Sequence, residues 1–231
     1  MSLPAVIIPG YFASHQEYRW LSNYLNDRGI HTVTVPINKR DWLPTVGGRS
    51  MMPILRKIDR TVKETLLQYN SSRVTLIGHS AGGWIARIYL GEKPYDIHGD
   101  AGEILWSARG SVSTLVTLGT PHVSQERWTK LNLDFVKNNY PDAFYPDVDY
   151  VCVAGKSIYG ERRPGAWLAY NSYLITCGQG NTWGDGITPI SAAHLQGATN
   201  LTFDGVNHSP TSTRLWYGSP EIVAQWLKFL P

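Results

Sequence analysis

The sequence predicts an α/β fold in which a mostly parallel central sheet carries helices on both faces. Short apolar runs rich in β-branched residues alternate with segments of helical periodicity from one end of the chain to the other. Only 17% of the residues are charged and 12% are aromatic, so a large apolar core can form. At 231 residues one α/β core suffices, and we expect residues 1–231 to form a single domain.

The first half of the chain contains three of these predicted units. We expect a strand at residues 5–8, followed by a helix that opens with a capping box of Ser14 and Glu17. A second strand is expected at residues 31–35. The segment 54–69 predicts an amphipathic helix, because its apolar residues recur at i, i+4 spacing.

The second half continues the alternation, with two long segments inserted. Strands are expected at residues 73–77, 113–118, 150–154 and 200–203, with helices at residues 84–90 and from Ser219 to the end. Residues 123–146, which are helical and aromatic, and residues 156–183, which are rich in Gly, Tyr and Trp, do not fit the minimal pattern. We expect these two segments to form a lid or a substrate wall at one end of the sheet.

The turn at residues 78–82 reads Gly-His-Ser-Ala-Gly and joins an expected strand to an expected helix. A serine on so sharp a turn is held in a strained backbone conformation, with its hydroxyl clear of the sheet. The following helix directs free N–H groups toward negative charge that develops beside the hydroxyl. Ser80 is therefore the candidate nucleophile; the alternative is a tight turn in which Ser80 only caps the helix.

A serine nucleophile needs an imidazole to accept its proton, and ligands in this fold class bind beyond the carboxyl ends of the strands. His208 follows the last expected strand and is the candidate base. His122 and His194 are the competitors. The alternative interpretation of His208 is an ordinary histidine on a surface loop.

A carboxylate is needed to orient that imidazole. Asp185, in the sequence Gly-Asp-Gly-Ile-Thr-Pro at residues 184–189, is the candidate because flanking glycines allow a tight turn that presents it inward. Asp147, Asp149 and Asp204 are rivals at strand edges. A plain Asp-Gly turn is the alternative.

The oxyanion that forms during attack on a carbonyl requires two backbone N–H donors. We expect one from Ala81, directly after the nucleophile, and the other from Tyr11 in the loop after the first strand, with Phe12 as an alternative. An ordinary turn at the end of the strand is the competing interpretation of this loop.

The chain resembles a lipase or esterase of the α/β-hydrolase superfamily. The resemblance rests on Gly-His-Ser-Ala-Gly-Gly at residues 78–83, Leu-Gly-Thr-Pro-His at residues 118–122, the Asp185 segment and the late His208, which preserve the order Ser, Asp, His. It implies an α/β-hydrolase fold and hydrolysis of a carboxylic ester through a serine acyl-enzyme. The first loop departs from the family, with Pro-Gly at residues 9–10 where many members carry His-Gly.

Aromatic side chains in the two inserted segments are candidates for an acyl pocket or, alternatively, for ordinary core and rim positions. They are Trp128, Phe135, Phe144, Tyr145, Tyr159, Trp167, Tyr170 and Trp183. Among candidate substrate-binding residues we also include Phe12 and His122. The alternatives within this reading are acyl transfer or thioester hydrolysis by the same triad, and a ligand receptor without useful turnover.

Charge and composition argue against several other classes of protein. The net charge is +3 and the basic residues are scattered, so nucleic-acid binding is not indicated. The two cysteines lack metal-ligand spacing, and we expect no metal and no cofactor. No apolar stretch could span a bilayer and no targeting peptide is recognisable, so we expect a soluble, cytoplasmic protein that acts on a small-molecule ester or lipid.

Overall fold

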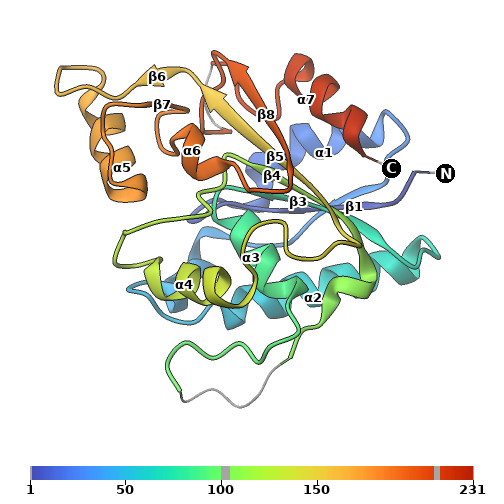
Figure 1. The fold of residues 1–231 in the computed structure, drawn as a ribbon. Helices are drawn as coiled ribbons and strands as arrows, with labels where there is room; N and C mark the ends of the chain where they lie inside the picture. The colour runs from blue at the N-terminus through green and yellow to red at the C-terminus, as the bar shows by residue number, and fades with distance from the viewer. Residues whose placement is uncertain (1, 100–104, 211–213, 231) are drawn as a thin grey trace.

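A computed structural model describes residues 2–99, 105–210 and 214–230. Its centre is a six-stranded sheet with the order β2-β1-β3-β4-β5-β8, and every neighbouring pair is parallel (Figure 1). The strands are β1 (Ala5–Ile8), β2 (Thr32–Thr34), β3 (Val74–His79), β4 (Val112–Leu118), β5 (Asp149–Lys156) and β8 (Thr199–Asp204). The predicted fold class is confirmed.

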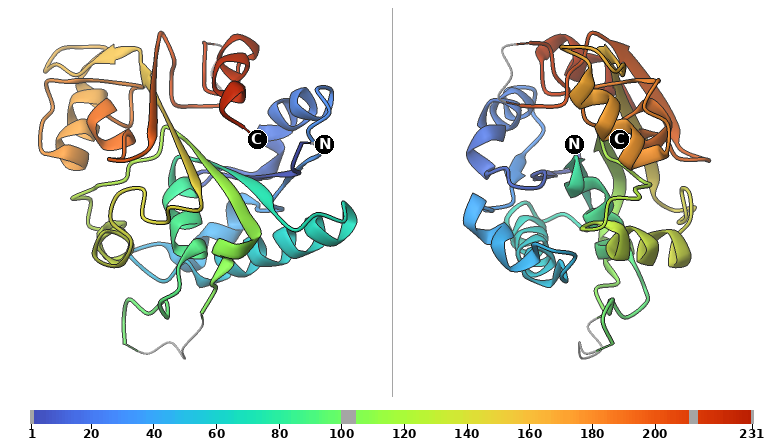
Figure 2. Two further views of the ribbon diagram at one scale, coloured as in Figure 1. Left: turned by 45° about the vertical axis from the view of Figure 1, so that its right-hand side comes forward. Right: turned by 90° about the vertical axis from the view of Figure 1, so that its left-hand side faces the viewer.

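Helices cover both faces of the sheet (Figure 2). One face carries α1 (Arg19–Asn26) and α7 (Pro220–Trp226), and the other carries α2 (Met52–Gln68), α3 (Ala81–Leu90) and α4 (Lys130–Asn139). Short 3-10 helices are η1 (His15–Tyr18), η2 (Lys39–Thr45), η3 (Ala108–Ser111) and η4 (Leu227–Phe229).

The period-two alternation of strand side chains divides the core between these two layers. In β1, Val6 and Ile8 pack into the cluster beneath α2 and α3, while Ala5 and Ile7 pack into the cluster beneath α1 and α7. All four side chains are fully buried. Because both faces of β1 are covered, an uninterrupted apolar run is the sequence that this strand requires.

Most predicted elements occur with small shifts of their ends. The capping box forms, since the Glu17 carboxylate accepts a hydrogen bond of 3.0 Å from the Ser14 N–H. The helix expected over residues 54–69 begins earlier, at Met52, because Pro53 suits the first turn of a helix. The last helix is shorter than expected, and α7 passes into η4 after Trp226.

The strand order changes direction at the carboxyl ends of β1 and β3. In the sheet β2 lies on one side of β1, and β3, the next strand in the chain, lies on the other side of β1. Such a switch in direction leaves an opening between the loops that follow the two strands, where ligands of open α/β sheets bind. The loop at residues 9–13 and the turn at Ser80 lie at this position.

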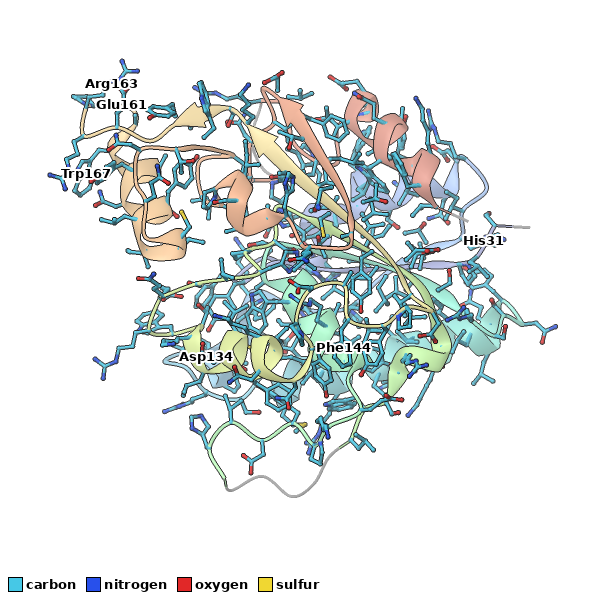
Figure 3. The ribbon with its side chains drawn as sticks, viewed as in Figure 1. His31, Asp134, Phe144, Glu161, Arg163 and Trp167 are labelled. Carbon is cyan, nitrogen blue, oxygen red and sulfur yellow. The ribbon has the colours of Figure 1, made fainter. Side chains whose placement is uncertain are left out.

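The two inserted segments lie against each other. Residues 123–146 contain α4, and residues 156–183 contain β6 (Ile158–Tyr159) and α5 (Trp167–Cys177). β6 pairs antiparallel with β7 (Trp183–Gly184), and α6 (Ile190–Ala193) follows. The Gln125 N–H donates a 3.0 Å hydrogen bond to the Ile175 carbonyl, which joins the segments. Figure 3 shows Glu161, Arg163 and Trp167 at the outer end of the second one.

Across the described residues, none of the helices combines the length and apolar character needed to cross a bilayer. Cys152 is a buried free thiol and Cys177 a partly exposed one. Burial raises the pKa of the Cys152 thiol, so this side chain stays protonated and packs as a small apolar group.

Candidate active site

Ser80 stands at the junction of β3 and α3 in a conformation that few residues adopt. Its φ is 52° and its ψ is −123°, outside the regions that L-residues favour. Its N–H donates to the Leu118 carbonyl at 2.9 Å, and the Thr120 hydroxyl donates to the Ser80 carbonyl at 2.8 Å. These bonds to the end of β4 hold the strained turn in place.

The two glycines of the motif are required by close backbone contacts. A Cβ on Gly82 would lie 2.3 Å from the Ile8 carbonyl oxygen, and one on Gly78 would lie 2.5 Å from the Gly83 Cα. Each contact is with main-chain atoms, which cannot move aside as a flexible side chain can. The pattern Gly-x-Ser-x-Gly therefore follows from the packing of β1, β3 and α3 against one another.

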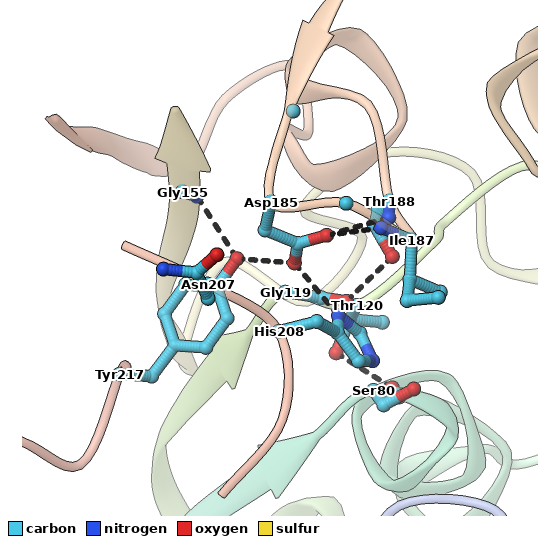
Figure 4. Close-up of polar contacts among 12 residues, drawn as sticks. Ser80, Gly119, Thr120, Gly155, Asp185, Ile187, Thr188, Asn207, His208 and Tyr217 are labelled. Carbon is cyan, nitrogen blue, oxygen red and sulfur yellow. Dashed lines mark hydrogen bonds and ion pairs between the residues drawn. The ribbon is translucent and has the colours of Figure 1, made fainter. Parts of the chain in front are cut away.

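Asp185 and His208 form a close pair on the loops that follow β7 and β8. His208 Nδ1 lies 2.7 Å from Asp185 Oδ2, and the His208 N–H donates to the Asp185 carbonyl at 3.0 Å. The Asp185 side chain is fully buried, whereas 13% of the His208 side chain is exposed. Figure 4 shows the His208 ring between Asp185 and Ser80. The Ser80 hydroxyl makes no hydrogen bond to another described residue, and that includes His208.

Four donors hold the Asp185 carboxylate. Oδ1 accepts from the N–H groups of Ile187 at 2.9 Å and Thr188 at 2.7 Å. Oδ2 accepts from the Tyr217 hydroxyl at 2.6 Å as well as facing His208. The Tyr217 oxygen in turn accepts from the Gly155 N–H at 2.9 Å, which directs its proton toward the carboxylate. Figure 4 shows these contacts.

The charges and hydrogen bonds around this pair determine which nitrogen of His208 carries a proton. Burial raises the pKa of Asp185, but the charge and hydrogen bond of His208 and the hydrogen bonds from Tyr217 and Thr188 outweigh it and hold the pKa below its usual value. An ionised carboxylate only accepts hydrogen bonds, so His208 Nδ1 carries the proton. In neutral His208, Nε2 is then the basic nitrogen.

The space for the carboxylate depends on Gly119, directly after β4. A Cβ there would lie 2.7 Å from Asp185 Oδ2, and the φ of +57° also favours glycine. The Thr188 hydroxyl donates to the Gly119 carbonyl at 3.0 Å and ties the Asp185 loop to this point. Sequence reasoning noted Gly119 only as part of the motif at residues 118–122 and did not identify Tyr217, because each acts on a residue distant in the chain.

The loop after β1 passes directly beside Ser80. A Cβ on Gly10 would lie 3.0 Å from the Ser80 Cβ. The Ala13 N–H closes a turn on the Gly10 carbonyl at 3.0 Å, and Phe12 has a positive φ of 58°. The Tyr11 hydroxyl accepts a 3.2 Å bond from Thr45, and neither the Tyr11 nor the Phe12 N–H donates to another described residue.

The Ala81 N–H opens α3, where backbone donors have no partner within the helix. The loop after β1 and the first turn of α3 thus both offer unpaired donors next to the Ser80 side chain. The roles of Tyr11 and Ala81 as oxyanion donors stay a prediction.

His122 does not join this group. Its ring lies 3.2 Å from an Arg87 guanidinium nitrogen and 3.3 Å from the Thr117 hydroxyl, and only 4% of the residue is exposed. Burial and the Arg87 charge hold its pKa well below the usual value. We find His122 to be a neutral core group behind β4 and β5, with its ring turned to Arg87 rather than to Asp185 or Ser80.

The remaining candidates are placed as follows. Trp183 is 43% exposed and contacts the Tyr159 ring, and Phe12 is also 43% exposed and contacts the Tyr11 ring. The competing residues have other partners. His194 contacts Thr202, Asp147 pairs with Arg109, and Asp204 pairs with Lys156, while Asp149 starts β5, at the end opposite to Ser80.

The aromatic residues of the inserted segments divide into two groups. Tyr145 and Tyr170 are buried, and Phe135 packs against the core cluster. Trp128, Phe144 and Trp167 are exposed, each by more than 40%. The buried members occupy core positions, and the exposed members stay candidates for an acyl pocket or for rim positions.

Comparisons with known proteins address the fold and the family. The family model of the PGAP1-like alpha/beta domain matches residues 2–143, a span that includes Tyr11 and Ser80 and ends before Asp185 and His208. No curated protein sequence gives a significant match.

Several solved structures resemble this chain at low sequence identity. MGS-MChE2, an alpha/beta hydrolase enzyme from the metagenome of Mar Chica lagoon sediments in Morocco, is 15% identical over 99% of this chain and 92% of that chain, with a TM-score of 0.50. A gene product of Listeria innocua is 13% identical over 98% and 93%, with a TM-score of 0.49. Aspergillus fumigatus lipase B is 10% identical over 87% of this chain, with a TM-score of 0.46.

The chain spans only 44% of the length of lipase B. At these identities the likeness concerns the fold, and the family match covers more than half of the chain. The chain therefore belongs to the PGAP1-like alpha/beta domain family.

Proposed function

We propose that this protein is a serine hydrolase that cleaves a carboxylic ester, with residues 1–231 acting as one catalytic domain. Ser80 is the nucleophile, His208 the base and Asp185 the group that orients the base. The observation that carries the proposal is the buried 2.7 Å contact between Asp185 and His208 beside a serine with elbow geometry. The hydrolase fold is consistent with it.

Attack begins when His208 Nε2 takes the hydroxyl proton of Ser80, as the serine oxygen forms a bond to the ester carbonyl carbon. The imidazolium that results is stabilised by the ionised Asp185, whose pKa lies below its usual value. Because four donors already hold that carboxylate, little reorganisation is needed when the positive charge forms.

The carbonyl oxygen becomes negatively charged in the tetrahedral intermediate. The Ala81 N–H at the start of α3 and the Tyr11 N–H in the loop after β1 are the proposed donors. The positive end of the α3 dipole adds to their effect. Loss of one such donor typically lowers turnover about 100-fold to 1,000-fold.

The intermediate collapses when imidazolium Nε2 donates its proton to the leaving alkoxide, which departs as the alcohol and leaves an acyl group on Ser80. A water molecule then loses a proton to His208 and attacks the acyl carbon. A second tetrahedral intermediate releases the carboxylic acid as the proton returns to Ser80.

An apolar acyl group suits the surface beside this site. Large apolar side chains are exposed on α5, on β7 and on the loop that carries Asp185; they are Trp167, Leu168, Ile175, Trp183 and Ile187. The Ser172 hydroxyl donates to the Ile187 carbonyl at 2.6 Å, and the Gly186 N–H donates to the Tyr173 hydroxyl at 2.8 Å. These bonds join α5 to the loop of the proposed acid, so we propose that residues 156–183 form a wall of the acyl site.

Hydrolysis of 4-nitrophenyl esters of increasing acyl length tests this proposal. We expect wild-type turnover that Ser80→Ala abolishes, whereas Ser22→Ala, which changes a serine on α1, retains it. A preference for longer chains would support the apolar wall. Wild-type rates equal to those of buffer, or equal rates for wild type and Ser80→Ala, would refute the proposed activity.

A further inference from the structure

A buried row of hydrogen bonds runs behind the candidate active site and does not include the Ser80 hydroxyl. The Gly10 N–H lies 3.0 Å from the Tyr18 hydroxyl oxygen. That oxygen lies 2.7 Å from His79 Nδ1, and His79 Nε2 lies 2.9 Å from the carbonyl oxygen of His208. The row thus connects the loop after β1 with the loop that carries the proposed base.

The two ends of the row determine the direction of every proton within it. A backbone N–H can only donate, so the Tyr18 oxygen accepts from Gly10 and its own proton points to His79 Nδ1. A backbone carbonyl can only accept, so His79 Nε2 carries a hydrogen and donates it to His208. One tautomer of neutral His79 satisfies both contacts.

His79 is neutral in this position. Tyr18 is fully buried and His79 is 3% exposed. Burial and the neighbouring charge of His208 lower the pKa of His79 to about 3. With both ring nitrogens in use, His79 has no free atom for proton transfer to a substrate. Its ring centre is 4.9 Å from that of His208, so a neutral ring also avoids repulsion of the imidazolium.

We propose that His79 is a positioning residue that holds the main chain of His208 and couples it, through Tyr18, to the loop that supplies the Tyr11 N–H. This inference rests on the proposed function. His79, the residue before the nucleophile, would then hold His208 and the Tyr11 N–H at fixed positions relative to Ser80. A shift of about 1 Å in such a group can cost on the order of 100-fold in rate.

Phosphonylation of Ser80 by a fluorophosphonate tests the coupling, because the first-order rate of the covalent step can be separated from binding of the probe. We expect His79→Leu to slow this step about 100-fold with the binding constant unchanged. His79→Gln, whose amide can both accept and donate, should recover part of the rate.

Tyr18→Phe removes one hydroxyl without a change of volume, and we expect an intermediate loss of about 10-fold. In the His79→Leu background the same change should have no further effect, because coupled residues are not additive. Tyr89→Phe is the matched control, since Tyr89 is a buried tyrosine on α3 whose hydroxyl contacts Asp59. Its rate should equal that of wild type.

A second measurement does not depend on reactivity. The proton between His208 Nδ1 and Asp185 gives a low-field NMR signal, which should broaden or move in His79→Leu and stay in place in Tyr89→Phe. If wild type is not phosphonylated, the proposed function fails, and this signal still tests the coupling. Folded His79→Leu and Tyr18→Phe with wild-type phosphonylation rates, or with an unmoved signal, would overturn the inference.

Discussion

The elbow at residues 78–83 and the Asp185–His208 pair are positioned in different ways. The elbow is shaped by contacts among neighbouring main-chain segments. These segments leave no room for a Cβ at Gly78 or Gly82. The pair is held by backbone N–H groups of the Asp185 loop and by a side chain from a remote segment, Tyr217. A local sequence pattern can therefore specify the first, whereas the second exists only after the carboxyl ends of several strands have come together.

This difference also separates the consequences of mutation. In the elbow, an added side chain meets main-chain atoms, so we expect mutations there to lower the free energy of unfolding. In the Asp185–His208 pair, polar groups can be replaced without new clashes, so we expect mutations there to lower kcat. The four predictions that follow test this contrast.

The largest expected effect is on the rate, in Asp185→Asn. An amide facing His208 Nδ1 favours the wrong tautomer of the imidazole, and we expect kcat for ester hydrolysis to fall about 10,000-fold. Asp204→Asn is the matched control, because Asp204 pairs with Lys156 on the surface and should retain wild-type kcat. Equal losses in both variants would remove Asp185 from the mechanism.

In the elbow we expect Gly82→Ala to lower the free energy of unfolding by roughly 3 kcal/mol, because its Cβ must displace the main chain of β1. Chemical denaturation measures this difference. The control is Gly110→Ala, since a Cβ on Gly110 meets no atom within 4 Å. A Gly82→Ala protein as stable as Gly110→Ala would show that the elbow tolerates side chains there.

Tyr217→Phe should affect the pair more gently. It removes one donor from Asp185 and leaves the Gly155 N–H without its acceptor. We expect kcat to fall about 10-fold and the free energy of unfolding to fall by about 1 to 2 kcal/mol. An unchanged kcat with the expected loss of stability would assign Tyr217 a purely structural role.

The smallest effect concerns His79 and pH. Its pKa is lowered to about 3 in the folded protein, so between pH 6.5 and that value the unfolded chain binds a proton that the folded protein does not. The contribution of His79 to the free energy of unfolding is therefore fully present well above pH 6.5 and decreases as the pH falls through that value. His79 should contribute about 1 kcal/mol of loss between pH 6 and pH 5. The stability of His79→Gln should vary less steeply with pH; an equal slope would contradict a neutral His79.

The sequence allowed prediction of the features that depend on local chemistry. The strand at residues 5–8 was predicted with its observed bounds, and the turn at Ser80 has the strained backbone that its glycines indicate. His208 was a candidate because it follows the last expected strand, and Asp185 because its flanking glycines allow a tight turn and because it precedes His208. A contact between them was expected, and the structure has it at 2.7 Å. The part played by Tyr217 could not be predicted, because it depends on how the loops after β7 and β8 meet the end of the chain.

Other features lay beyond the sequence for the same physical reason. His122 follows a strand end as a site residue would, yet its ring turns into the core because Arg87 and Thr117 provide partners there. The contacts of His79 and Tyr18 join residues far apart in the chain, so no local periodicity marks them. Residues 156–183 were expected to form a lid or wall only because they depart from the alternation of strands and helices.

The central claim is that Ser80 becomes acylated with the help of His208. Its most direct test is to treat wild type, Ser80→Ala, His208→Ala and His122→Ala with a fluorophosphonate, and to map the modified residue by mass spectrometry. We predict modification at Ser80 in wild type and His122→Ala, and none in Ser80→Ala or His208→Ala. Modification that persists in folded Ser80→Ala, or that His122→Ala abolishes while His208→Ala does not, would contradict the assignment of nucleophile and base.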